Sequence, residues 1–591
     1  MSTNKHIEAI CAVITVLALI VTALFMNGEA LGIEKITDED AERNSDSAYF
    51  TANDLDGGWA TDGATVITLT GDGAQIDGTG AYAYDGGAVI ANGGRYVVRG
   101  TLTDGTLTVD AYRSSKVWIL LDGVSITCAD DACILVEQAD KVFLTLADGS
   151  ENTLVSGETF SADAVSALRD GAIFSRDDLT INGGGALTVS AAYKHGIVGY
   201  DDLVIAGGTI SVTAAGDAIR ANDSLRIRGA EITAEAGDDA LVADNEGAYL
   251  YVESGALDLA GGGDAIHAAG EITLAGGTLA IRAGDDAIRS DAAVTVTDGT
   301  IRIAECYEGI EAVTVEIAGG ETSIVSADNG VNANGGAAEA RIRISGGTLT
   351  IVNETGRDAD GLDSNGDIEI TGGTVRIFLA GSGGNCAIDC GSESGGTATI
   401  TGGTVIACGS SAMAENFAAE STQGAVLWNL TETAAAGSAI RVLDENGAEL
   451  LTGEAACAFT SVLVSCPQMA QGGTYRIAVG GTEETVTLTE TVATLGQSGF
   501  GGQGGFGGAP FGENETEDGA SDGETRPHRG FGGGQRTEDG ERGSFTPPEG
   551  EPPEGFTPPE GEPPEGMEPP EGFTPPEGEE FTPSEGDGKA V

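Results

Sequence analysis

Basic residues are scarce in this sequence, and their scarcity excludes one class of function. The 591 residues carry 28 Lys and Arg against 93 Asp and Glu, which gives a formal net charge of −65. Nucleic-acid binding depends on basic side chains that meet phosphates, so we expect no nucleic-acid partner. An acidic surface of this size instead requires counter-cations, above all if its ligand is itself acidic.

Aromatic residues are also few, at 5% of the chain with three tryptophans, whereas glycine occurs 94 times. This composition is typical of small residues on tight, repeated turns rather than of a conventional mixed globule. Trp59, Trp118 and Trp428 are expected to pack in the core or the caps, which leaves little support for stacking platforms under neutral sugars. His195 and His267 have no evident Ser or Cys partner, so hydrolytic triads gain no support.

No cysteine spacing matches a zinc site, although the chain has nine cysteines. Buried free thiols are the default expectation for a fold of this size. If a disulfide forms, Cys457 and Cys466 are the most suitable pair.

An internal repeat dominates the middle of the chain. Its unit is an alternating apolar strand, a Gly-Gly-Thr turn and a second strand, as in residues 203–212, 272–281 and 342–351. Acidic turns keep a similar period, with spacings of 22, 25, 22, 22 and 21 residues. The residues of this acidic column each precede a small residue and then Ile, Leu or Val; they are Asp217, Asp239, Asp264, Asp286, Glu308 and Asn329, and Asp360 continues the column after an insertion.

Two columns with one period indicate one structural unit of about 22 residues. Three short strands and three turns fill such a unit, and neighbouring units stack at about 4.8 Å. We therefore predict an all-β fold, a right-handed parallel β-helix, with roughly 14 coils between residues 95 and 408. The glycine and β-branched content nearly excludes helices from this region.

The rest of the chain is divided by composition. The apolar run 7–26 within residues 1–30 is long enough for a membrane anchor, with a cleaved signal as the alternative, and either leads to export and a place at the cell surface. Residues 31–94 are expected to form a linker and N-terminal cap, 95–408 the β-helix, and 409–495 a small C-terminal β domain. Residues 496–591 are Gly-rich and then Pro/Glu-rich, so we predict a disordered tail.

Oxygen ligands are densest at residues 358–367, which hold four carboxylates and one side-chain amide. Such a set suits a hard divalent cation, Ca²⁺ above all. Stacked carboxylates about 5 Å apart repel by about 3 kcal/mol per pair at an effective dielectric near 20, unless a cation bridges them. Alternatively, isolated Asp residues only shape turns through hydrogen bonds to the backbone. The predicted Ca²⁺ ligands are Asp238, Asp239, Asp285, Asp286, Glu308, Glu311, Asp328, Asn329, Asn332, Asp358, Asp360, Asp363, Asn365 and Asp367.

Three motifs occur in order: Glu-Cys-Tyr-Glu-Gly-Ile-Glu-Ala at 305–312, Asp-Asn-Gly-Val-Asn-Ala-Asn-Gly-Gly at 328–336, and Asp-Gly-Leu-Asp-Ser-Asn-Gly-Asp at 360–367. With these motifs the chain resembles a bacterial carbohydrate-binding β-helix family, of the clostridial cellulose- and polygalacturonate-binding type, from about residue 85 to 490. That family is similar to family 9 polysaccharide lyases in fold and calcium sites. The resemblance implies pectin-type ligands held through Ca²⁺.

We therefore expect non-catalytic, Ca²⁺-dependent binding of a polysaccharide of the pectate or cellulose type. A calcium-dependent polysaccharide lyase and a structural adhesin or envelope spacer are the alternatives. A lyase needs a base beside the calcium, and no lysine occurs between His195 and Gly588, so Arg289 and Arg357 are the candidates. These two arginines are also the candidate ligand-binding side chains, although pairing with neighbouring carboxylates such as Asp358 is their simpler role.

Overall fold

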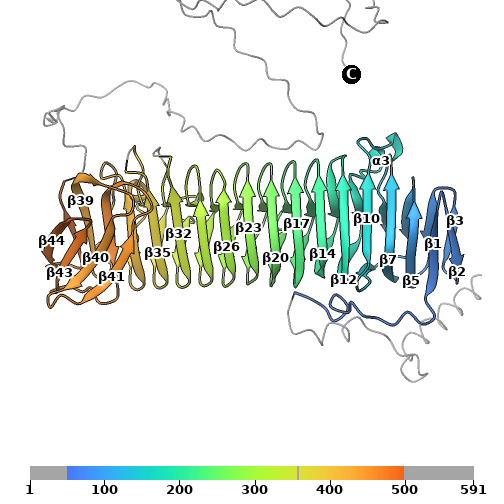
Figure 1. Ribbon diagram of the computed structural model, residues 1–591, viewed down its shortest axis with the longest axis horizontal. Coiled ribbons are helices and arrows are strands. Elements are labelled where there is room, and N and C mark those ends of the chain that lie inside the picture. The colour runs from blue at the N-terminus through green and yellow to red at the C-terminus, as the bar shows by residue number, and fades with distance from the viewer. Residues whose placement is uncertain (1–48, 356–358, 382, 498–591) are drawn as a thin grey trace, which may run out of the picture. The chain divides into compact units, whose positions relative to one another are not determined.

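The computed structural model describes residues 49–355, 359–381 and 383–497, and these residues form a long parallel β-helix (Figure 1). The predicted all-β parallel β-helix is therefore confirmed. Within the described ranges no helix has the length and apolar character needed to cross a membrane. The predicted anchor at 7–26 and the predicted tail lie outside these ranges.

One coil shows why the repeat folds in this way. It contains three strands, β24 (Ile288–Ser290), β25 (Ala293–Val296) and β26 (Thr300–Glu305). Apolar residues alternate with polar ones along each strand, so that every second side chain points into the solenoid. The inward side chains of the two longer strands are at most 2% exposed: Val294, Val296, Ile301 and Ile303.

The short strand of each coil belongs to one sheet, which we call sheet B. It begins with an antiparallel pair, after which every strand pairs in parallel with the next. The strands of sheet B are β3 (Ala81–Tyr84), β4 (Gly87–Ile90), β6 (Thr106–Asp110), β8 (Ile134–Gln138), β11 (Gly171–Ser175), β13 (His195–Gly199), β15 (Ile219–Ala221), β18 (Leu241–Ala243), β21 (Ile266–Ala268), β24, β27 (Ile310–Ala312), β30 (Val331–Ala333), β33 (Leu362–Ser364) and β36 (Ile388–Cys390).

The other two strands of each coil form the first and second lateral faces. On the first lie β5 (Gly94–Leu102), β7 (Lys116–Cys128), β9 (Lys141–Leu146), β12 (Asp178–Ala191), β14 (Asp202–Ala214), β16 (Ser224–Ile227), β19 (Tyr249–Val252), β22 (Ile272–Leu274), β25, β28 (Thr314–Ile317), β31 (Arg341–Ile344), β34 (Asp367–Ile370) and β37 (Ala398–Ile400). On the second lie β10 (Glu151–Ser156), β17 (Ala230–Ala236), β20 (Gly255–Gly261), β23 (Thr278–Ala283), β26, β29 (Glu321–Val325), β32 (Thr348–Asn353), β35 (Thr374–Leu379) and β38 (Thr404–Gly409), together with the second halves of the longest strands.

The number of coils between residues 95 and 408 is smaller than predicted. In the described part of that range sheet B has 12 strands, from β6 to β36, where we expected roughly 14. Several coils exceed 22 residues: Ile134 pairs with Ile173 across the insertion that holds helix α3 (Ala162–Ser166), and Val331 pairs with Leu362. A uniform period therefore overestimates the count.

Both ends of the regular solenoid are covered by further strands. At the start, β1 (Thr65–Gly71) pairs with β5 and with β2 (Ala74–Asp77). At the end, β38 pairs antiparallel with β42 (Phe459–Ser465), which also pairs with β39 (Ala425–Ala434), and β39 pairs with β45 (Val492–Leu495). A separate four-stranded sheet contains β40 (Ala439–Asp444), β41 (Glu449–Glu454), β43 (Thr474–Val479) and β44 (Thr482–Thr487).

Residues 49–60, which we call the N-terminal strap, run along the first lateral face (the dark blue segment beneath the solenoid in Figure 1). At one end the Arg226 Nη1 atom of β16 donates to the Tyr49 carbonyl at 3.0 Å. Further along, the Asp54 carboxylate is fully buried and lies 2.9 Å from the Lys141 ammonium of β9. Trp59 is buried near the other end. The strap thus links strands that are far from it in sequence.

The cysteines of the described ranges are all buried free thiols, eight in number. The expectation of free thiols is therefore confirmed, and Cys457 and Cys466 do not form a disulfide.

Candidate functional site

The acidic column lies along one edge of sheet B, one residue per coil. Asp239, Asp264 and Asp286 are at most 6% exposed. The Asp264 N–H donates to Asp239 Oδ1 at 2.8 Å, and the Asp286 N–H donates to Asp264 Oδ1 at 2.9 Å. The same contact joins the Asp360 N–H to Asn329 Oδ1 at 2.8 Å. One side-chain oxygen of these residues therefore shapes the coil, as the structural alternative predicts, and any further chemistry depends on what the second oxygen faces.

A small residue after each column position lets the column lie this close to the solenoid wall. Gly361 follows Asp360, and a Cβ atom there would lie 2.4 Å from the Ile377 Cγ2 atom. Gly309, after Glu308, would likewise place a Cβ 2.3 Å from the Gly330 carbonyl oxygen. The pattern of an acidic, a small and a branched residue is thus a packing requirement as well as a repeat signal.

A second file of side chains runs beside the column, three residues after each column position. We call it the facing file. Its members occupy the middle position of sheet B strands. Apart from the buried Val242 of β18, they are more exposed than their two buried neighbours in each strand, as in β24, β27 and β33. Strand register stacks them in the order Arg220, Val242, His267, Arg289, Glu311, Asn332, Asp363 and Asp389.

The facing file is basic in its N-terminal part, where its side chains form ion pairs with the carboxylates of the acidic column. Arg220 Nη1 lies 2.9 Å from Asp217 Oδ2, and His267 Nδ1 lies 3.7 Å from Asp239 Oδ2. Burial lowers the pKa of His267, but the hydrogen bond to Asp239 and the charge of Asp264 outweigh burial and raise that pKa overall. Pairing offsets part of the repulsion in these coils, but burial and the charge of Asp239 still raise the pKa of Asp264 to about 6. Asp239, Asp264 and His267 also place one ligand atom each within 4.8 Å of one another.

The facing file turns acidic at Glu311, and there the carboxylates converge. Asp286, Glu308 and Glu311, which we call the Glu308 group, each place one oxygen within 4.8 Å of the others. Burial raises the pKa of Asp286 to about 10, with the hydrogen bond and charge of Glu311 adding to it. Burial also raises the pKa of Glu308 to about 8, although the Asn332 amide donates to it at 2.9 Å. Such carboxyls keep their protons at neutral pH unless a cation takes the protons' place.

A second convergence lies further along. Asp360, Asp363 and Asp389, which we call the Asp363 group, also place one oxygen each within 4.8 Å of one another. The Asn329 amide donates to Asp363 Oδ2 at 3.0 Å and thereby orients that carboxylate. Both groups offer oxygen atoms only, which is the donor set that fits a hard cation such as Ca²⁺.

Asp389 is absent from the predicted ligands. Strand β36 continues sheet B and pairs Asp389 with Asp363. The signal was present in the sequence, because Ala-Ile-Asp-Cys at 387–390 has the same pattern as Gly-Leu-Asp-Ser at 361–364.

The structure does not bring all predicted ligands together. Asn365 is exposed and donates from Nδ2 to the Gly335 carbonyl at 3.1 Å. Asp367 begins β34 on the first lateral face and accepts from the Thr397 N–H at 2.9 Å. Both side chains therefore stabilise the backbone through hydrogen bonds and belong to neither carboxylate group.

The remaining predicted ligands lie on the turns that precede the column or outside the described ranges. Asp238 has an oxygen within 4.8 Å of ligand atoms of Asp217 and Asp239. Asp285 is exposed and Asp328 half-buried, each directly before a column residue. Asp358 and Arg357 lie outside the described residues.

Arg289 lies at the boundary between the basic and acidic parts of the facing file. Burial lowers its pKa, but the charges of Glu311, Asp264 and Asp286 outweigh burial and raise that pKa above the usual arginine value. A guanidinium held in its protonated form is a poor proton acceptor. Its surroundings suit a counter-charge better than a catalytic base.

The chain is similar to proteins described by the binding of carbohydrate. A family model of carbohydrate-binding domain-containing proteins matches residues 85–359. A curated relative from Acetivibrio thermocellus, also described as a carbohydrate-binding domain-containing protein, is 40% identical over 126 residues, which are 21% of this chain and 44% of the relative. The matched part thus spans less than half of that relative. The expected resemblance to carbohydrate-binding proteins is confirmed.

A solved structure, described as the polysaccharide lyase-like protein from C. thermocellum in a gadolinium derivative, is 29% identical to this chain. The match covers 44% of this chain and 92% of that structure, with a TM-score of 0.33.

Proposed function

We propose that this protein binds an acidic polysaccharide without cleaving it, through Ca²⁺ held by the Glu308 group and the Asp363 group. The observation that carries the proposal is the change of the facing file from basic to acidic at Glu311. Before this point the converging column carboxylates have Arg220 or His267 beside them, whereas at Glu311 and at Asp363 the facing side chain is itself one of three carboxylates that converge within 4.8 Å. Carboxyls with pKa values of about 10 and about 8 indicate a site whose anionic form needs a cation.

The chain's own residues would fix the ligand oxygens in place. The Cys386 N–H donates to Asp360 Oδ1, and the Asn329 and Asn332 amides orient Asp363 and Glu308. When bound, Ca²⁺ would supply the positive charge that an otherwise acidic surface lacks for contact with uronate carboxylates. A rigid solenoid keeps the two groups at a constant separation, which suits a polymer with regularly spaced carboxylates.

Binding is favoured over cleavage because the described part of the site offers Arg289 as its nearby base, and the charges around it keep that arginine protonated. Attachment at the cell surface through residues 7–26 is part of the proposal and rests on the apolar run in the sequence.

The test is retention of the full chain on immobilised polygalacturonate, with Ca²⁺ and with EDTA. We expect retention with Ca²⁺ that EDTA abolishes, and loss of retention in the double variant E308Q/E311Q. The matched control, E316Q/E321Q, changes the same charge on two glutamates of the lateral faces, the half-buried Glu316 and the exposed Glu321, and should be retained like the wild type. Retention that survives EDTA would refute the role of calcium, and release of unsaturated uronate products, measured by absorbance, would favour the lyase.

A further inference from the structure

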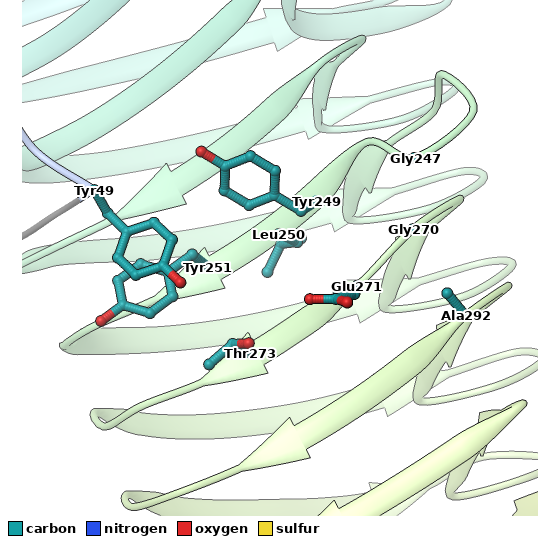
Figure 2. Close-up of a pocket in the computed structure, with 9 residues that line it drawn as sticks. All are labelled: Tyr49, Gly247, Tyr249, Leu250, Tyr251, Gly270, Glu271, Thr273 and Ala292. Carbon is teal, nitrogen blue, oxygen red and sulfur yellow. The ribbon is translucent and has the colours of Figure 1, made fainter.

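A cavity of about 380 Å³ lies on the first lateral face, and no residue of either carboxylate group lines it (Figure 2). Tyr249 and Tyr251 of β19 line it together with Glu271 and with Thr273 of β22. Tyr49 of the N-terminal strap completes the lining, although it is some 200 residues distant in sequence. The volume is within the range of small-molecule sites.

Three tyrosine rings give this cavity an aromatic wall. Tyr49 stacks on Tyr251 with ring centroids 3.8 Å apart and planes inclined by 16°. The Tyr249 ring lies 6.1 Å from Tyr49 at 58°, so the two rings form an angled corner. Figure 2 shows the three rings on one side of the opening, with Glu271 and Thr273 beside them. Tyr49 remains 36% exposed, so part of its ring is accessible to a ligand.

The polar groups are arranged on the adjoining strand. Strand register places Thr273 directly beside Tyr251, and the exposed Glu271 lies just before β22. Glu271 is the one charged residue that lines the described cavity. A carboxylate can accept hydrogen bonds from two neighbouring hydroxyls, whereas it repels another carboxylate.

We propose that this tyrosine pocket binds a neutral pyranose unit of a polysaccharide. A pyranose ring has a C–H face that packs on an aromatic ring and hydroxyls at its edge that donate to carboxylates. A uronate would bring a second negative charge next to Glu271, so the pocket discriminates against the sugars proposed for the carboxylate groups. The inference rests on the proposed carbohydrate-binding function and adds a second, calcium-independent site with a different sugar preference.

The N-terminal strap is required for this site. Its end is fixed by the hydrogen bond from Arg226 to the Tyr49 carbonyl, and the neighbouring Phe50 is buried, with its ring 6.2 Å from that of Tyr251. Tyr49 therefore lies at the pocket because its own carbonyl and the next side chain, Phe50, are both held on the solenoid.

The experiment is calorimetric titration of the full chain with neutral hexasaccharides of β-1,4-linked glucose, mannose and xylose, and with hexagalacturonate, all in EDTA. At least one neutral hexasaccharide should bind and hexagalacturonate should not. Tyr249→Ala should weaken neutral binding at least about tenfold, and Tyr249→Phe should keep most of it. Tyr82→Ala, at a 54% exposed tyrosine on β3, is the matched control and should bind like the wild type.

Glu271→Ala tests the pocket independently in case the Tyr249 variant misfolds, because Glu271 is exposed and its substitution should not disturb the fold. It should weaken neutral binding about fivefold or more, through loss of the hydrogen-bond acceptor. The inference is overturned if no neutral hexasaccharide binds, if Tyr82→Ala is as damaging as Tyr249→Ala, or if binding requires Ca²⁺. Failure of the proposed function would be seen separately, as loss of calcium-dependent polygalacturonate retention while neutral binding in EDTA persists.

Discussion

Calcium binding to the Glu308 group is expected to release about two protons at pH 7. In the ion-free protein burial raises the pKa of Asp286 to about 10 and that of Glu308 to about 8. At pH 7 the first carboxyl is then almost fully protonated and the second about nine-tenths protonated. Both must be ionised to bind a divalent cation, so their protons leave as the cation enters.

The sign of the pH dependence follows from these values. Both folded-state pKa values lie above the ordinary values of 3.8 and 4.5, so between about pH 4 and pH 10 the ion-free folded protein binds more protons than the unfolded chain. Its free energy of unfolding should therefore fall as the pH rises through this window. Calcium affinity should rise, by about 100-fold per pH unit below pH 8 and about tenfold per unit between pH 8 and pH 10.

The assay is calorimetric titration with Ca²⁺ in buffers of different ionisation enthalpy, which yields the number of protons released. The variant E308Q removes one titrating carboxyl and should release about one proton, with weaker binding, whereas E321Q, at an exposed glutamate of β29, should match the wild type. Calcium affinity that is independent of pH, or proton release that is unchanged in E308Q, would refute the assignment of the ion to this group.

Three further outcomes follow from the same geometry. Asp389→Asn should weaken calcium binding at the Asp363 group in a calcium titration, whereas Asp367→Asn, whose carboxylate holds the Thr397 N–H, should not. Asp264→Ala leaves a buried backbone N–H of the next coil without its acceptor and should lower the free energy of unfolding by about 1–3 kcal/mol in denaturant titration, while Asp264→Asn keeps most of it. Glu311→Arg extends the basic part of the facing file, so it should abolish calcium binding at the Glu308 group, leave it at the Asp363 group, and raise the thermal stability of the ion-free protein.

The period of the fold could be predicted because two independent sequence patterns repeat with it. The Gly-Gly-Thr turns and the acidic column both recur at about 22 residues, and the small residue after each column position is fixed by the close approach of the next coil. The number of coils could not be predicted as accurately from the sequence. Insertions such as the one that contains α3 lengthen a coil without changing its place in the stack.

The site was predicted less completely for a related reason. The dense acidic sequence at 358–367 led to the prediction of Asn365 and Asp367 as ligands, but their side chains form hydrogen bonds to the backbone of neighbouring coils. Asp389 belongs to the next coil and is adjacent only through strand register. The tyrosine pocket could not be predicted from the sequence, because Tyr49 contacts Tyr251 only when the N-terminal strap docks on the solenoid.

The decisive property of the site is the identity of one residue per coil. Stacking at about 4.8 Å brings the column carboxylates together whether or not they have a function, and this repeated proximity is unfavourable without compensation. Where the facing residue is Arg220 or His267, ion pairs with the column supply part of the compensation. Where it is Glu311 or Asp363, the like charges add to those of the column. Arg289 offsets part of the charge at the Glu308 group. The remaining compensation in those coils comes from protons or from a bound cation, and only a cation leaves a positive charge available to an acidic polymer.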